Sequence, residues 1–490
     1  MDSILRKVIV GGGVTLLAVG IAKAMVFVSY VIAARILDPD EYGALSIVIY
    51  LQNFAVVIGC FGVPITITKK ISQWMAKDVS MAQVVGSALL FLLLFSSAIT
   101  SVGYLLLSET IAVDLYADPQ LVRVLQLSSL FVLIACLNTT LSAFVQGCQK
   151  ITALAKISAV TAILWQPIAV VTILTFGLEG AVLAMIIYNA MGASMLFYVA
   201  RKSLPISFAK AGEFLGDRAK RKDLLLFTIP AFLMTVMISP AYWVGRTWLG
   251  LSWDFAEVGN FQIADSISQI LLIVPFAISV PLLPAVSERY ALDPKSIGGT
   301  SGTLLRLIAF VLVLLTIVAI PLMRTGIVWV FGEDYEGAYA ATILMFAAAT
   351  YISAGSVMSN VIFGMGRMWD ALALNLVWLA VFLALMSYTV PDYGSEGLAA
   401  TYAVSYSLYV SLIFVYIRMK LGVSIARVTI FAAAFMAYVF VYDLYLLEED
   451  FFIKALTTAV VGLVFAIIGY FFMLTADDRA QAKGLLGIGR

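Results

Sequence analysis

Two charged side chains stand within long apolar stretches of the sequence. Lys23 lies near the middle of the stretch 8–34, and Asp265 lies within the stretch 258–286. A charge at the centre of a membrane helix costs about 2.5–3.5 kcal/mol on insertion scales. Such a residue usually faces a cavity or a partner, which makes Lys23 a candidate substrate-binding residue and Asp265 a candidate for coupling to H+ or Na+. The alternative is that the two charges pair with each other as a structural clamp.

Other polar residues extend this candidate site, and each also has a structural explanation. Tyr30 lies one heptad beyond Lys23, and Gln262 and Gln269 share the helical face of Asp265. Interhelical hydrogen bonds would explain most buried amides, and an aromatic belt would explain Tyr30. Arg35 and Arg246 mark the outer ends of the predicted first and seventh helices, where we expect snorkelling or turn residues more than anion ligands. The predicted substrate-binding set is Lys23, Tyr30, Arg35, Gln52, Asn53, Arg246, Gln262 and Gln269.

Several kinds of chemistry find no support in the sequence. The chain has no histidine, and its three cysteines all fall in apolar stretches where they pack as small side chains. Asp38-Pro39-Asp40 has the spacing of a metal-nucleotide motif but lies in a short turn, and Gly11-Gly12-Gly13 lacks the ending of a phosphate-binding loop. We therefore expect no enzyme activity, no metal, no cofactor and no nucleic-acid partner.

Composition places these residues in a membrane. Of 490 residues, 62% are hydrophobic and only 12% are charged, whereas soluble domains carry about 25% charged residues. A bilayer core needs roughly 20 apolar residues per helix, so we expect an all-α polytopic fold of fourteen transmembrane helices. The first is expected to be a retained helix and not a cleaved signal. The predicted ranges are 8–34, 42–68, 83–107, 120–147, 151–176, 178–200, 224–249, 258–286, 300–323, 336–364, 369–390, 395–417, 425–446 and 452–474.

Charge distribution predicts how these helices face the membrane. With the N-terminus inside, the outer segments hold only the basic residues Arg35, Arg123, Arg246, Arg324 and Lys454. The remaining basic residues then fall in inner segments, which the positive-inside rule favours. Both termini are therefore expected to be cytoplasmic. The segment 69–82 is expected to be an amphipathic helix on the inner surface.

The sequence also predicts an internal repeat. A shift of 217 residues places Gly147 on Gly364, Lys150 on Arg367 and Gly177 on Gly394. A unit of six helices is even-numbered, so both copies face the same way, with a substrate site expected between them. The predicted parts are a first lobe 1–202, a basic linker 203–223, a second lobe 224–419, and two extra helices with a tail in 420–490.

Several motifs resemble the Wzx-type polysaccharide flippases of the multidrug/oligosaccharidyl-lipid/polysaccharide (MOP) exporter superfamily. They are Arg35–Gly43 (RILDPDEYG), Pro281–Ser287, Phe331–Tyr335 and Gly364–Arg367. The resemblance implies two lobes around a cavity that opens alternately to each side. It also implies a polyprenyl-linked oligosaccharide as substrate, with Lys23 attracting its pyrophosphate. The same resemblance implies the inner membrane, a functional monomer, and glycan polymerase or ligase components as partners.

Four alternatives stay open at this point. A cation-coupled multidrug antiporter or a lipid II flippase could use the same fold. The antiporter would require more acidic groups in its cavity than Asp265 alone. The lipid II flippase would require a cluster of arginine residues in its cavity. A membrane glycosyltransferase would need a base and a large outer loop, neither of which is evident. A scaffold role in cell-wall assembly is the fourth alternative.

Overall fold

A computed structural model of the chain describes residues 20–21, 23–75, 77–236, 239–272, 297–365, 367–422, 426–447, 449–476 and 478–479. All the regular structure in these ranges is helical. Nine of the described helices are long and apolar enough to cross a membrane, and two of them, each 52 residues long, contain two predicted helices. The expected all-α polytopic membrane fold is therefore confirmed, while the start of the first helix and the motif 281–287 lie outside the described residues.

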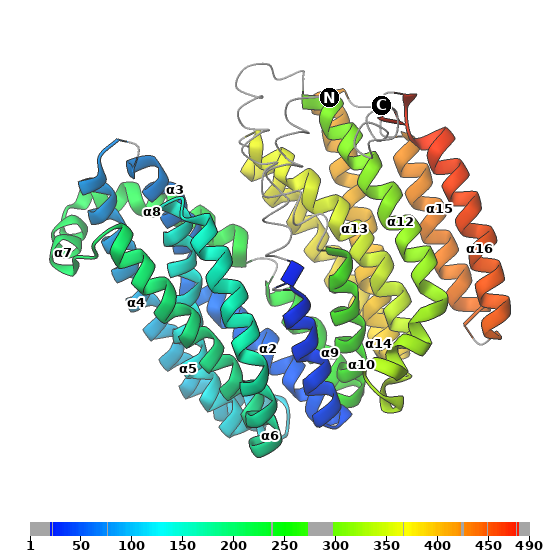
Figure 1. Ribbon diagram of the computed structural model, residues 1–490, viewed down its shortest axis with the longest axis horizontal. Coiled ribbons are helices and arrows are strands. Elements are labelled where there is room, and N and C mark those ends of the chain that lie inside the picture. Colours follow the sequence, from blue (N-terminus) through cyan, green and yellow to red (C-terminus); the bar gives the residue numbers. More distant parts are fainter. Residues whose placement is uncertain are drawn as a thin grey trace. The chain divides into compact units, whose positions relative to one another are not determined.

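Residues 24–259 form one compact unit (Figure 1). It contains all but the first residue of the helix over residues 23–36, and its core is α5, which packs against α2, α4 and α6. The basic stretch 203–223 contains the short helix α7, which packs on α4. The labelled helices are α2 (Pro39–Cys60), α3 (Val63–Met75), α4 (Val79–Glu109), α5 (Leu121–Gly147), α6 (Ile151–Ser203), α7 (Phe208–Gly216), α8 (Arg218–Val236) and α9 (Ser239–Ser252).

Lys23 and the residues from 260 onward belong to the other unit. Its helix α13 packs against both α12 and α14, and α12 also packs against α16 (Figure 1). Its helices are α10 (Phe255–Ser268, which begins in the first unit), α12 (Ile297–Val330), α13 (Ala338–Gly364), α14 (Met368–Leu421), α15 (Ala426–Tyr445) and α16 (Phe451–Ile468). The predicted lobe boundaries at 202 and 224 stay a prediction.

The repeat predicted from the sequence recurs in the backbone at the same offset of 217 residues. α5 and α13 are both 27 residues long, and α6 and α14 both begin four residues after them. Each of these long helices is interrupted once, at Gly177 (φ 54°, ψ −130°) and at Gly394 (φ 52°, ψ −131°). The sequence predicted these two breaks. A segment that turns at equivalent residues in both copies indicates one structural unit used twice.

The tight reversals depend on a second pair of glycines. An added Cβ at Gly180 would lie 1.9 Å from the carbonyl oxygen of Thr172, and one at Gly397 would lie 2.1 Å from that of Thr389. No side chain fits at such distances, so the two halves of α6, and likewise those of α14, approach each other backbone to backbone. Each reversal thereby places residues from both halves of one long helix on a common face.

Two helices differ from their predicted ranges. The predicted helix 42–68 is broken at Phe61 (φ 47°) and Gly62 (φ 71°), both left-handed, so that α2 ends and α3 begins there. The predicted amphipathic helix 69–82 was wrong. Its first part is the end of α3, its last part opens α4 behind the cap residue Asp78, and Ile71 is fully buried against Gly86 of α4 and Gly147 of α5.

The predicted linker and seventh helix also have more structure than expected. Residues 203–223 contain α7 and the start of α8. The predicted helix 224–249 lies on two helices, α8 and α9, which the described residues show on either side of positions 237–238.

A buried ion pair fastens the end of the chain to α12. Arg306 Nε donates to Asp478 Oδ2 at 2.5 Å and Nη2 donates to Oδ1 at 2.9 Å, with the Asp478 side chain fully buried. The backbone N–H of Thr475 also donates to Asp478, at 2.8 Å. Burial alone would raise the pKa of Asp478, but the hydrogen bonds from Arg306, Thr303 and Thr475 outweigh it and lower the pKa to about 2.

We expect Gly177→Ala to lower the free energy of unfolding by about 1–3 kcal/mol, because a side chain at this φ and ψ is strained. An added Cβ would meet only Glu41 Oε1 at 3.9 Å, so backbone strain and not a clash would cause the loss. Gly212→Ala is the matched control, since that glycine is helical and has open space around it. Thermal unfolding followed by size-exclusion chromatography measures both variants. Equal melting temperatures for the Gly177→Ala and Gly212→Ala variants would contradict backbone strain at residue 177.

We expect Asp478→Asn to destabilise the chain by about 3–5 kcal/mol at neutral pH, because Arg306 loses the partner that compensates its buried charge. The pKa of Asp478 is lower in the folded chain than its ordinary 3.8, so its stabilisation is complete above about pH 4 and is lost as the pH falls toward 2. The difference in melting temperature between wild type and variant should therefore shrink below pH 4. A difference that grows with acid would contradict this account.

Candidate functional site

A row of polar side chains follows one face of α10. Gln262, Asp265 and Ser266 are buried, and Gln269 is half-buried where the helix tightens into a 3-10 turn. Gln262 Nε2 donates to Ser266 Oγ at 3.1 Å, and Gln269 Nε2 donates to Asp265 Oδ1 at 3.3 Å. The shared face expected from spacing is confirmed, and hydrogen bonds along it orient the Asp265 carboxylate.

Lys23 interacts with this row. The residue is half-buried in the helix over residues 23–36, and its ammonium interacts electrostatically with the carboxylate of Asp265. The two charges that stand in apolar stretches therefore interact with each other, in the sense of the pairing that the sequence left open. Removing one of two interacting charges in a low-dielectric setting leaves the other without that compensation. An anion that competes for Lys23 would thus change the electrostatic state of Asp265.

Arg246 is buried, with 1% of its surface exposed. The guanidinium lies 3.4 Å from the centre of the Tyr50 ring, Nε donates to Ser46 Oγ at 3.1 Å, and Nη1 donates to the carbonyl of Tyr242 at 3.3 Å. The expectation that Arg246 snorkels at a helix end was wrong. A planar guanidinium that stacks on an aromatic ring is less costly to bury than an ammonium, and it ties α9 to α2.

The candidates Gln52, Asn53 and Arg35 lie in the unit of residues 24–259. Gln52 is fully buried and its Nε2 donates to Ser128 Oγ at 2.6 Å, so it links α2 to α5 inside the first unit. Asn53 and Arg35 are exposed. Lys23, Gln262, Asp265 and Gln269 therefore belong to one unit, whereas Gln52, Asn53 and Arg35 belong to the other.

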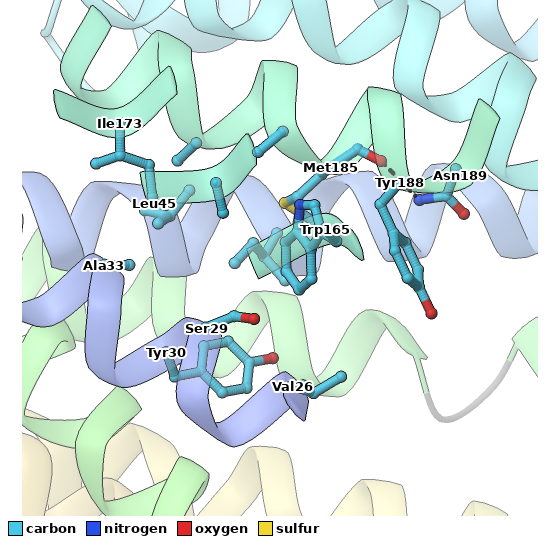
Figure 2. A pocket seen from close by; sticks show the side chains of 14 residues that line it. Val26, Ser29, Tyr30, Ala33, Leu45, Trp165, Ile173, Met185, Tyr188 and Asn189 are labelled. Atoms are coloured by element: carbon cyan, nitrogen blue, oxygen red, sulfur yellow. Dashed lines mark hydrogen bonds between the residues drawn. The ribbon is translucent and has the colours of Figure 1, made fainter. Parts of the chain in front are cut away.

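Tyr30 lines a cavity of about 170 Å3 inside the unit of residues 24–259. Figure 2 shows the Trp165 indole between Tyr30 on the helix over residues 23–36 and Met185 and Tyr188 on the second half of α6. The Trp165 and Tyr188 rings are 5.1 Å apart. The other lining residues are Val26, Ser29, Ala33, Leu45, Ile49, Ala169, Ile173, Ala181, Ala184 and Asn189.

The sequence analysis missed Trp165, Tyr188 and Asn189 as lining residues. Aromatic and amide side chains inside apolar helices are common, so their type alone gives no signal. The repeat would have given one, because the offset of 217 places Trp165 on Phe382 and Asn189 on Tyr406, residues of different size or polarity. Within the described ranges, no group of histidine, cysteine and acidic residues could hold a metal ion.

Comparison with known proteins places this arrangement in context. The family model described as "Polysaccharide biosynthesis protein" matches residues 8–289. Lipid III flippases of Escherichia coli K12 and Shigella flexneri are each 23% identical over 369 residues, which cover 71% of this chain and 82% of theirs.

Solved structures share the fold at lower identity. The lipid II flippase MurJ in an inward closed conformation has a TM-score of 0.70 at 14% identity, covering 93% of this chain and 98% of its own. An inward-facing multidrug resistance MATE family transporter of the MOP superfamily has a TM-score of 0.68 at 15% identity, covering 83% and 94%. The family model covers more than half of the sequence and the fold is that of MOP-superfamily transporters, so this chain belongs to the polysaccharide biosynthesis protein family.

Proposed function

We propose that the chain is a flippase that moves a polyprenyl-(pyro)phosphate-linked oligosaccharide from the cytoplasmic to the outer leaflet, for the synthesis of a surface glycan. The observation that carries this proposal is the similarity to lipid III flippases over most of both chains. The apolar membrane-spanning helices and the buried charges on α10 and the first helix support it. The proposal includes alternating access of two six-helix lobes, without a catalytic step.

Lys23 is the residue that we propose to bind the acidic headgroup. Phosphate oxygens are strong acceptors, and hydrogen bonds between an ammonium and a phosphate are roughly twice as strong as neutral ones. The polar row of Gln262 and Gln269 offers amide groups for sugar hydroxyls close to this cation. The lipid tail stays in the bilayer, so only the headgroup has to leave water.

The pairing of Lys23 with Asp265 suggests how transport is coupled. A pyrophosphate that binds Lys23 competes with the Asp265 carboxylate, which then loses its compensating charge. A buried carboxylate without such compensation is costly, so it favours uptake of a cation, either H+ or Na+. Binding of the anionic headgroup would thus be linked to cation uptake at Asp265, and release of the headgroup would restore the ion pair.

Orientation and partners form part of the same proposal. The basic segments favour a cytoplasmic location for both termini in the inner membrane. Each chain would work as a monomer, because the proposed site lies within one chain, and glycan polymerase or ligase components would receive the product. The extra helices α15 and α16 give a surface that such components could contact.

Lys23→Ala should reduce translocation of lipid-linked oligosaccharide by about 10- to 100-fold, since it removes a charged hydrogen bond worth about 1.5–3 kcal/mol. Lys23→Arg should retain part of the activity because it keeps the charge. Lys150→Ala, at an exposed lysine, is the control. Proteoliposomes with labelled lipid-linked oligosaccharide give the rates. Wild-type rates in properly inserted Lys23→Ala would remove Lys23 from the site.

Asp265→Asn should abolish the response of translocation to imposed H+ and Na+ gradients, because an amide cannot exchange a proton or neutralise a cation. The basal rate without a gradient should fall less than the stimulated rate. Gln269→Glu tests whether the position of the carboxylate matters, since it adds a carboxylate one helical turn from Asp265. The same proteoliposomes, with each gradient imposed separately, give the measurement. A wild-type gradient response in Asp265→Asn would assign coupling elsewhere.

A further inference from the structure

The two copies of the repeat differ where the cavity lies. In the first copy, small residues at Ala169, Ala181 and Ala184 leave space around Trp165. At the offset of 217 the second copy has Met386 opposite Ala169 and Leu398 opposite Ala181. Both copies share the backbone reversal at Gly177 and Gly394. The open space therefore comes from side-chain choice and not from a different fold.

Aromatic rings fill the equivalent region of the second copy. Phe382 and Tyr402, which correspond to Trp165 and Met185, are 0% and 2% exposed, and their ring centres lie 5.0 Å apart. Tyr406, which corresponds to Asn189, stacks on Tyr402 at 6.3 Å. Interiors are normally close-packed, and an unfilled cavity reduces stability. A cavity kept in one copy and filled in the other suggests that the first copy uses it.

The lining of the cavity suits a hydrocarbon. Most lining residues are aliphatic, and the two small polar ones are already engaged. Ser29 Oγ donates to the Met25 carbonyl and to Gln166 Oε1, while Asn189 accepts from Asn138 and donates to the Met185 carbonyl. The Trp165 Nε1–H is buried and has no acceptor among the described residues. The cavity thus offers mostly apolar surface, and the tyrosines Tyr30 and Tyr188 are its other polar lining residues.

The size and the position of the cavity narrow the choice of ligand further. A cavity of about 150 Å3 with aliphatic walls binds benzene, and an isoprene unit is of similar size. Lys23 precedes the lining residue Val26 by three positions on one helix, a rise of about 4.5 Å. In a polyprenyl phosphate the hydrocarbon starts directly at the phosphate ester. In a glycerophospholipid two ester carbonyls intervene, and the lining has few free donors for them.

We infer that this cavity binds the phosphate-proximal isoprene of the carrier lipid. The inference rests on the proposed flippase function and adds a recognition site for the carrier itself. Trp165 lines the cavity with its ring. Such a site would select the carrier over bulk phospholipid, independently of the sugar.

The second copy supplies the test variant. Ala169→Met, Ala181→Leu and Met185→Tyr together introduce the side chains that pack at residues 386, 398 and 402. Binding of radiolabelled undecaprenyl phosphate to the purified full chain should weaken about tenfold or more, because every carbon that loses its burial weakens binding severalfold. Binding of dioleoylphosphatidylglycerol should not change. Ser194→Leu adds apolar volume at an exposed position of α6 and is the control.

Unchanged binding of undecaprenyl phosphate to the filled variant would overturn the inference. Equal weakening for both lipids would also overturn it, because it would show an acyl-chain pocket. If the filled variant does not fold, wild-type chain is photolabelled with a polyprenyl phosphate that carries a diazirine on its first isoprene. Adducts within residues 26–49 or 165–189 support the site, and adducts only elsewhere overturn it.

Failure of this inference can be separated from failure of the proposed function. Wild-type proteoliposomes that translocate no lipid-linked oligosaccharide would contradict the flippase proposal itself. Wild-type translocation together with normal carrier binding by the filled variant would contradict only the isoprene site. The Lys23 variants report on the phosphate, whereas the cavity variant leaves Lys23 in place and reports on the hydrocarbon.

Discussion

A charge within a membrane protein must be compensated, and the electrostatic interaction of Lys23 with Asp265 contributes to this compensation. Hydrogen bonding from Gln269 orients the acid. In a substrate-free flippase the pair keeps the polar row neutral, so the row can lie among apolar helices. A phosphate is the kind of anion that can replace the carboxylate at the lysine. The proposed headgroup site and the proposed cation coupling both depend on this interaction.

The repeat provides the framework on which this asymmetric chemistry is placed. Both copies share helix lengths, cap positions and the reversal at Gly177 and Gly394. Neither Asp265 nor Lys23 has a charged counterpart at the offset of 217, and the cavity around Trp165 corresponds to packed rings at Phe382 and Tyr402. The equivalent parts therefore hold the fold, and the residues in which the copies differ are the ones that suggest function.

The sequence was sufficient to predict the helices, the repeat and the central charges. Each of these predictions depends on a strong local signal in the sequence. The signals are the length of an apolar stretch, a glycine between two apolar stretches, and a charge that is costly to bury in a membrane. It did not predict the break at Phe61, because a left-handed phenylalanine has no sequence signature. Burial of Arg246 depends on stacking with Tyr50 from a distant helix. The cavity depends on which small side chains face each other across α6, and pattern analysis of one copy alone does not show this.

The most direct test of the account is a double-mutant cycle at residues 23 and 265, measured as translocation of lipid-linked oligosaccharide in proteoliposomes. Lys23→Met and Asp265→Asn are compared singly and together. If the phosphate and the carboxylate compete for one ammonium, the two effects are coupled, and the double variant is no slower than Lys23→Met alone. Losses that multiply independently would contradict a shared site, because they would show that each residue acts without the other.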